Sequence, residues 1–185
     1  MSIVPPLRLD FLNGWLLLVA YFMGLTLSAL AFPPDKRKKL FLEPHYPRGH
    51  PRWIILALGW IAAIAFVALS GFIGLQVGTW VFCLGLALYA LGYLVVMVSL
   101  AAYRRALPEA LVADGLYRHS RNPQWLGLVA VFLGMALAEG GWLPLILVLI
   151  LVVAYHFQIL LEEKVCTSAY GQSYSDYMKR VPRYL

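Results

Sequence analysis

Two polar segments on either side of the last pair of apolar runs hold the side chains best suited to chemistry. The first segment, Gly115–Gly127, contains Arg118 and Arg121, and the second begins with Glu162 and Glu163 at the end of the final apolar run. Two helices that cross a membrane as a hairpin return to the same face, so these charged side chains are expected to meet there. Opposite charges gathered at a membrane face indicate a binding site for a charged or zwitterionic ligand.

The pair Asn122-Pro123 predicts where a helix starts. Asn is a favoured N-cap residue, and Pro suits the first helical position because its missing N–H is not needed there. The free backbone N–H groups of that helix end, beside Arg118 and Arg121, can bind a carboxylate or a phosphate. The alternative is that the two arginines only anchor the helix end to lipid phosphates. The nearby carboxylates favour the binding site.

The final apolar run continues without a helix breaker into Glu162 and Glu163, so the same helix presents His156 and Gln158. His156 and Glu163 are seven residues apart, which places them on one helix face about 10 Å apart along the axis. Carboxylates at the edge of the hydrocarbon are costly unless paired or hydrated, which makes them candidates for function. Two simpler interpretations stay open: the acids end a solvated helix, and His156 makes a helix–helix hydrogen bond.

Aromatic residues recur at three-residue spacing after a predicted turn at Gly171, at Tyr174 and Tyr177, and the segment ends in Val181-Pro182-Arg183. A stripe of this kind usually packs against the protein, and it can also roof a pocket above the hairpin. A basic helix start, two carboxylates and stacked aromatic rings suit a zwitterionic ligand that contains an aromatic group.

The composition places the chain among integral membrane proteins. Hydrophobic residues make up 62% of the 185 residues and charged residues 13%, which leaves nothing for a separate soluble domain. A helical span takes about 20 apolar residues. Five runs fit: Leu12–Phe32, Trp53–Ile73, Thr79–Ala101, Trp125–Ala138 and Trp142–Leu161. We therefore predict an all-α membrane protein with about five transmembrane helices.

These helices form one membrane domain over residues 1–185, with three spans in 1–102 and the loop, hairpin and tail that carry the site in 103–185. Because the fourth run is short, a re-entrant helix is the main alternative, together with fusion of residues 74–78 into a neighbouring span. The first run lacks a basic n-region and a small-residue cleavage site, so we interpret it as a retained span rather than a signal peptide.

Basic residues divide unequally between the predicted loops. With five spans, 14 of the 15 Lys and Arg residues lie on one side and Arg8 alone on the other, so the positive-inside rule puts the tail in the cytoplasm and the N-terminus outside. A basic rim facing anionic membrane lipids explains the net charge of +6, and no nucleic acid partner is expected. Cys83 and Cys166 lie at different predicted depths, so no disulfide is expected, and no metal-ligand spacing occurs.

At these residues the chain resembles the isoprenylcysteine carboxyl methyltransferases and the related phospholipid methyltransferases. That group carries a Gly-x-Tyr-x-x-x-Arg-His-Pro-x-Tyr-x-Gly stretch before a helical hairpin, then Glu-Glu and a Phe-Gly-x-x-Tyr-x-x-Tyr-x-x-x-Val-Pro segment. The matching positions here are Gly115, Tyr117, Arg121, Asn122, Pro123, Trp125 and Gly127, then Glu162, Glu163, Tyr170, Gly171, Tyr174, Tyr177, Val181 and Pro182.

The resemblance implies S-adenosylmethionine as cofactor, bound between the cytoplasmic ends of the last helices, and a lipophilic or lipid-linked methyl acceptor taken from the bilayer. The implied cofactor-binding residues are Tyr117, Arg118, Arg121, Asn122, Pro123, Trp125, His156, Glu162, Glu163 and Tyr174. Arg121, Glu163 and Glu109 are the implied catalytic residues. Arg121 can align either the cofactor or an acceptor carboxylate, and these two roles stay open.

Two positions depart from the family pattern: Asn122 replaces the usual His, and Trp125 replaces Tyr. Glu109 also stands where the prenylcysteine enzymes carry a His. A carboxylate acceptor needs no general base because it is already ionised, whereas an amine acceptor such as phosphatidylethanolamine must lose a proton to Glu109, His156 or Glu163. The acceptor therefore stays open.

Two other functions remain in view. Membrane sterol reductases carry a similar C-terminal pattern and use NADPH, although five spans are about half of what they need. A non-enzymatic membrane scaffold would tolerate replacement of Arg121 and Glu162. The short chain favours a prokaryotic inner membrane, with the active site facing the cytoplasm, and the oligomeric state is left open.

Overall fold

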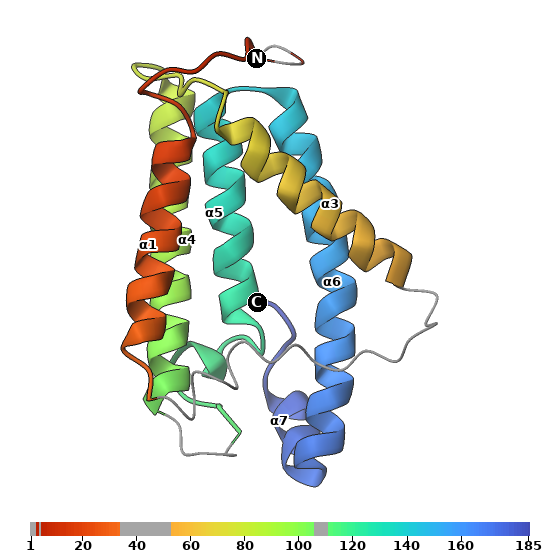
Figure 1. Cartoon of the computed structure of the whole chain (residues 1–185). Helices are drawn as coiled ribbons and strands as arrows, with labels where there is room; N and C mark the ends of the chain where they lie inside the picture. The colour runs from red at the N-terminus through yellow and green to blue at the C-terminus, as the bar shows by residue number, and fades with distance from the viewer. Residues whose placement is uncertain (1–2, 4, 34–52, 106–110) are drawn as a thin grey trace.

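The described part of the chain is all-helical. The computed structural model describes residues 3, 5–33, 53–105 and 111–185, and Figure 1 shows how their helices are arranged. They are α1 (Trp15–Leu30), α3 (Trp53–Ser70), α4 (Trp80–Arg105), the 3₁₀ turn η1 (Gly115–Arg118), α5 (Pro123–Glu139), α6 (Trp142–Tyr170) and α7 (Gln172–Arg180). Each of the five predicted apolar runs corresponds to one of the apolar helices α1, α3, α4, α5 and α6.

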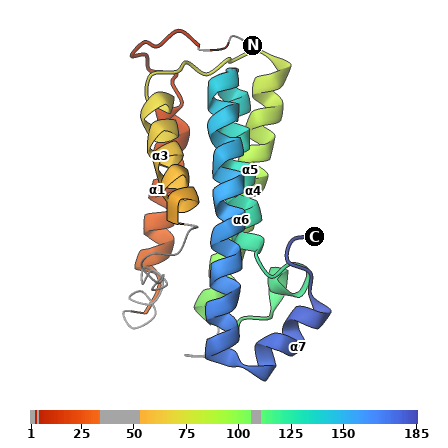
Figure 2. The same cartoon turned by 90° about the vertical axis from the view of Figure 1, so that its right-hand side faces the viewer.

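Three of these helices, α3, α4 and α6, are long and apolar enough to cross a membrane, and α1 and α5 are shorter apolar helices. The longest is α6, with 29 residues, which corresponds to about 43 Å of helix against about 30 Å of hydrocarbon. Its last turns therefore extend beyond the apolar layer at the end where α7 lies (Figures 1 and 2). Gly171 ends α6 with φ of +55°, a conformation that favours glycine, so the predicted turn is confirmed.

Glycines let α4 and α5 pack backbone against backbone. A Cβ at Gly92 would lie 2.6 Å from the carbonyl oxygen of Gly127, and one at Gly134 would lie 2.5 Å from that of Gly85. Small residues at such spacing are typical of helices that associate inside a membrane. This close contact fixes the start of α5 relative to α4, and the site described below begins at the start of α5.

Replacing Gly85 with leucine is expected to separate these helices and to reduce the yield of folded protein. A Cβ there would lie 2.6 Å from both the Ala138 nitrogen and the Gly134 oxygen, and these backbone atoms cannot move aside without shifting a helix. Overpacking of this kind costs about 1–3 kcal/mol or more. Ala87→Leu is the matched control, because Ala87 is an exposed position of the same helix. Thermal unfolding in detergent measures the difference, and equal melting temperatures would contradict the close packing.

The remaining helices pack around an aromatic core. Phe66 of α3 meets Phe132 of α5 edge to face at 5.2 Å, and the Tyr21 ring of α1 lies 6.3 Å from Phe132. Between α3 and α6, a Cβ at Gly59 would overlap the side chain of Ala154. The core therefore draws residues from both the first three apolar helices and the last two.

At the end of the bundle away from α7, three connecting segments are hydrogen-bonded together. The Arg8 nitrogen donates to the Phe72 oxygen at 2.8 Å, and the Gly14 nitrogen donates to Ile73 at 3.0 Å. The Gln76 nitrogen donates to the last turn of α5 at the Ala138 oxygen, at 2.9 Å. These bonds hold the start of α1 close to the ends of α3 and α5.

Candidate cofactor and acceptor site

The site begins where the last residues of the chain meet the loop before α5. The Arg121 nitrogen donates to the Pro182 oxygen at 3.0 Å. The Ser120 hydroxyl and the Asn122 amide both donate to the Arg183 oxygen, at 3.3 and 3.1 Å. Two segments about 60 residues apart therefore form one wall, held together largely through the backbone.

Asn122 plays a different part from the predicted one. The helix does begin at Pro123, as predicted, but the Asn122 side chain makes no capping hydrogen bond. Its side-chain amide donates to the Arg183 carbonyl instead. The backbone N–H of Asn122 donates to the Ser120 hydroxyl oxygen at 3.1 Å. The capping role is therefore wrong, because a tertiary contact takes the side chain that a local rule assigned to the helix end.

Glu163 lies between two arginines. Its Oε1 lies 3.3 Å from Arg121 Nη1, and its Oε2 lies 2.8 Å from Arg183 Nη2. Arg183 Nε lies 3.1 Å from both oxygens, so this arginine binds the carboxylate in a forked arrangement. The Arg121 and Glu163 side chains are only 10% and 9% exposed. The hydrogen bonds to Glu163 raise the pKa of Arg183 above its ordinary value, so the guanidinium stays charged.

The charges of this cluster do not cancel. Two guanidinium groups share one carboxylate, which leaves one net positive charge. The buried Nε of Arg121 has no hydrogen-bond partner among the described residues. A buried N–H that is left unpaired is unfavourable, and this one belongs to a cation close to the N-terminal end of α5, which also favours an anion. The arrangement fits a ligand carboxylate bound at Arg121 Nε.

The second carboxylate, Glu162, is held by neutral donors. The Trp125 indole Nε1 donates to Glu162 Oε2 at 3.0 Å, and the Gln158 amide donates to Oε1 at 3.2 Å. The family pattern has a tyrosine hydroxyl at position 125, and here the indole N–H supplies the donor. Neither of these two partners is a cation, and burial raises the pKa of the Glu162 carboxyl above its ordinary value. A positively charged ligand group would therefore stabilise the ionised form of Glu162.

An apolar cavity of about 420 Å³ lies between α5 and α6. Its lining is aliphatic and aromatic, with His156 and Tyr184 as its polar members beside Trp125. His156 Nδ1 and the Tyr184 hydroxyl are 2.6 Å apart. The final residues of the chain therefore reach from the carboxylate cluster to this cavity, and Figures 1 and 2 show the tail turning back from α7 toward the start of α5.

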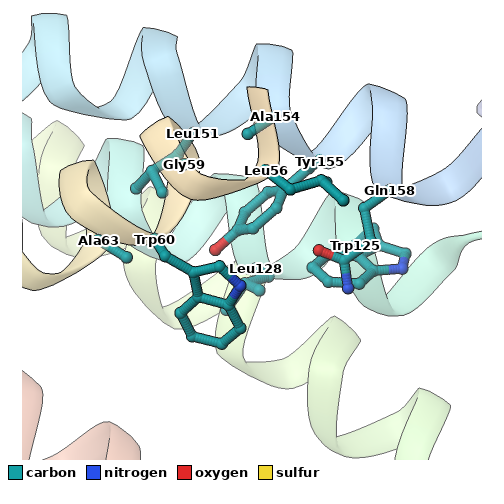
Figure 3. A pocket seen from close by; sticks show the side chains of 10 residues that line it. All are labelled: Leu56, Gly59, Trp60, Ala63, Trp125, Leu128, Leu151, Ala154, Tyr155 and Gln158. Carbon is teal, nitrogen blue, oxygen red and sulfur yellow. The ribbon is translucent and has the colours of Figure 1, made fainter. Parts of the chain in front are cut away.

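A smaller cavity of about 160 Å³ lies on the other side, where α3 meets α5 and α6. Figure 3 shows the rings of Trp60, Tyr155 and Trp125 gathered at this cavity, with Gln158 beside them. Trp125 and Tyr155 line both cavities, and their ring centroids are 4.6 Å apart. These two rings therefore form the wall between the cavities, and the Trp125 end of the wall is hydrogen-bonded to Glu162.

The tail tyrosines pack as the more common interpretation of their spacing predicted. Tyr174 and Tyr177 are buried with Val181 in a cluster that covers the loop before α5. The Tyr177 hydroxyl donates to the Tyr117 carbonyl at 2.6 Å. Burial raises the pKa of Tyr177 to about 12 and that of Tyr117 further. Both phenols are therefore neutral at physiological pH and act as donors rather than as bases.

Two predicted site residues are not placed in this cluster. Arg118 is 71% exposed and pairs with Asp114 at 2.8 Å, so its side chain is directed to solvent at the η1 turn. Glu109 lies outside the described residues. The role of Arg118 in binding stays a prediction, as does the assignment of the other residues to cofactor or catalysis.

Three residues of the cluster were missing from the predicted site: Ser120, Arg183 and Tyr184. The Val181-Pro182-Arg183 ending was noticed as a boundary of the tail segment only. The available signal was that Arg183 directly follows the Val181-Pro182 pair of the family pattern. The position of Tyr184 beside His156 follows from the folded tail and has no local sequence signal.

The fold and the site define a helical protein of the membrane-spanning class, with a buried anion-binding cluster next to apolar cavities. The chain belongs to the phospholipid methyltransferase family, whose profile matches residues 79–173. Members of this family are membrane methyltransferases that use S-adenosylmethionine. The matched region contains α4, η1, α5 and α6, and ends just before Tyr174.

One curated relative supports the same placement. The chain is 32% identical over 84 residues to the protein-S-isoprenylcysteine O-methyltransferase of Schizosaccharomyces pombe. The alignment covers 45% of this chain and 36% of that protein, so the chain matches little more than a third of the length of this relative. The resemblance stated from the motifs is confirmed.

Proposed function

We propose that this protein transfers a methyl group from S-adenosylmethionine to a lipophilic or lipid-linked acceptor at the cytoplasmic face of a prokaryotic inner membrane. The observation that carries the proposal is the unpaired Nε of Arg121 within the Arg121–Glu163–Arg183 cluster. Family membership supports the same chemistry. The basic residues Arg104, Arg105, Lys179 and Arg180 lie at the α7 end of the bundle, and this supports the cytoplasmic placement of that end.

The residues of the site fit the parts of the cofactor. Arg121 would hold the carboxylate of its amino-acid portion through Nε, while Glu163 keeps Arg121 and Arg183 in position. Glu162, oriented by Trp125 and Gln158, would bind a positively charged or hydroxyl group. The cofactor supplies a sulfonium methyl group, and the protein contributes orientation and exclusion of water.

The acceptor would bind with its apolar portion in the cavity of about 420 Å³ between α5 and α6. The contacts of Glu163 and His156 limit the candidate bases. Glu163 is occupied by two arginines, so it is a poor base. His156 faces this cavity with Nδ1 on the Tyr184 hydroxyl, which leaves Nε2 to take the proton of an amine acceptor. A carboxylate acceptor would need no base.

Cofactor binding is the first test. Calorimetric titration of the detergent-purified protein with S-adenosylhomocysteine is expected to show micromolar binding, with NADPH titrated in parallel. Binding of NADPH without binding of S-adenosylhomocysteine would overturn the proposal in favour of a reductase. No binding of either would overturn it in favour of a non-enzymatic protein.

The linkage of the product identifies the acceptor class. The protein is incubated with methyl-labelled S-adenosylmethionine and a membrane lipid extract, and the labelled lipids are then treated with alkali. A methyl ester releases its label as volatile methanol, whereas an N-methyl product keeps its label. Label in neither fraction, from protein that binds S-adenosylhomocysteine, would overturn the lipid acceptor but not the cofactor.

A further inference from the structure

The end of the bundle opposite the proposed site contains a buried carboxylate that methyl transfer does not use. Glu139, the last residue of α5, is 0% exposed. Neither of its oxygens has a hydrogen-bond partner, and no Lys or Arg forms an ion pair with it, in the part of the chain that the structure describes. A buried, uncompensated carboxylate is strongly unfavourable, so something must neutralise it.

Two neutral side chains at the same end of the bundle also have unpaired oxygens. Ser70 Oγ and Asn13 Oδ1 have no hydrogen-bond partner among the described residues, and both residues are 0% exposed. The amide nitrogen of Asn13 donates to the oxygens of Arg8, at 2.6 Å, and Gly71, at 3.1 Å. This fixes the side chain so that its oxygen is free to accept.

Gly14 shows that Glu139 and Ser70 meet at one place. A Cβ at Gly14 would overlap Glu139 Oε1, and it would lie 2.9 Å from the carbonyl oxygen of Ser70. Asn13 precedes Gly14 in the chain. Glu139, Ser70 and the start of α1 therefore surround a small buried space that contains acceptor oxygens. Gly14 leaves this space open because it has no side chain.

We propose that Glu139, Ser70 and Asn13 bind a monovalent metal cation, with Na⁺ as the best match. All the offered ligands are oxygens, which hard cations prefer. One carboxylate neutralises a single positive charge, whereas a divalent ion would leave a net charge buried. Ser70 and Glu139 are the last residues of α3 and α5, and the negative ends of two helix dipoles favour a cation at this point.

The cation would join three helices at the end of the bundle away from the cofactor. The ligands come from the start of α1 and from the ends of α3 and α5, and these segments otherwise depend on backbone hydrogen bonds between their loops. A ligand that binds only the folded state raises the free energy of unfolding. Once the ligand concentration exceeds the dissociation constant, this increase grows with the logarithm of the concentration. The proposal therefore predicts stability that depends on Na⁺.

Thermal unfolding in detergent tests this prediction, with NaCl exchanged against choline chloride at constant ionic strength and pH. The melting temperature is expected to rise by about 5 °C between Na⁺-free buffer and saturating Na⁺, and by less with K⁺. A competing arrangement has Glu139 protonated and hydrogen-bonded with the Ser70 hydroxyl, with no bound cation. It predicts the same melting temperature in Na⁺ and in choline, and that result would overturn the proposal.

Single substitutions test whether the Na⁺-dependent stability arises at these residues. Ser70→Ala removes one neutral ligand and is expected to raise the half-maximal Na⁺ concentration about tenfold. Ser99→Ala is the matched control, because Ser99 is equally buried but its hydroxyl already donates to the Val95 oxygen at 2.7 Å. Glu139→Gln is expected to abolish the response to Na⁺ while S-adenosylhomocysteine binding at the other end is kept.

If Glu139→Gln fails to fold, Ser70→Ala decides alone. A Ser70→Ala protein with the wild-type Na⁺ response, or a folded Glu139→Gln protein that keeps it, would overturn the assignment. The measurement does not depend on methyl transfer, so the cation site and the proposed function can fail separately.

Discussion

Replacement of Glu163 by glutamine is expected to abolish turnover and to weaken S-adenosylhomocysteine binding at least a hundredfold. Glutamine keeps the size of the side chain but removes the charge that Arg121 and Arg183 share. Two buried or half-buried guanidinium groups would then face each other without a carboxylate. Removing one partner of a buried ion pair typically costs about 3–5 kcal/mol.

The same change should also disturb the wall of the site. Arg183 is attached to Glu163 through its side chain and to Ser120 and Asn122 through its carbonyl, so release of the guanidinium weakens the contact between the tail and the loop. Asp176→Asn is the matched control, since it removes one carboxylate from an exposed position of α7. Calorimetry, turnover and thermal unfolding are measured for both variants. Wild-type affinity in folded Glu163→Gln protein would contradict the assignment.

Replacement of Arg121 by lysine is expected to reduce S-adenosylhomocysteine affinity between tenfold and a hundredfold. Lysine keeps the positive charge near Glu163 but has no N–H in the position of Nε, which is buried and unpaired in the free protein. A hydrogen bond between charged groups contributes about 1.5–3 kcal/mol. The backbone hydrogen bond from residue 121 to the Pro182 oxygen is retained, so the tail stays attached.

Arg180→Lys is the control for this experiment, because Arg180 is exposed, lies outside the proposed site and donates its Nε to the Asp176 carbonyl at 3.3 Å. Its affinity for S-adenosylhomocysteine is expected to equal that of the wild type. If the two lysine variants bind equally well, the Nε of Arg121 does not meet the ligand, and the fit of the cluster to a carboxylate fails.

The sequence predicted the elements of this site better than its contacts. The start of α5 at Pro123, the long α6 and the turn at Gly171 follow from local rules, because proline and glycine restrict the backbone wherever they occur. The meeting of Arg121 with Glu163 follows from the hairpin, because two helices joined by a short turn return to the same end. These features do not depend on distant parts of the chain.

The contacts that were missed at the site depend on how the tail folds back. Arg183 reaches Glu163 only because α7 packs its tyrosines on the loop before α5. Asn122 gives its amide to the Arg183 carbonyl instead of capping α5 for the same reason. The burial of Glu139 against Gly14 likewise depends on three loops meeting at one end. Side-chain direction in these cases is set by tertiary packing, which no local pattern contains.

The wall that Trp125 and Tyr155 form between the two cavities affects how the substrate specificity of this fold could change in evolution. Trp125 and Tyr155 separate two apolar cavities, but only Trp125 has a hydrogen bond to a carboxylate of the cluster in the contacts described above. A substitution at position 125 therefore changes the space for hydrocarbon and the charged chemistry together. A smaller residue at position 155 would join the cavities and admit a bulkier chain with Glu162 still oriented by its indole partner. Under the proposed function, position 155 thus offers an evolutionary route to new acceptors that leaves the methyl donor unchanged.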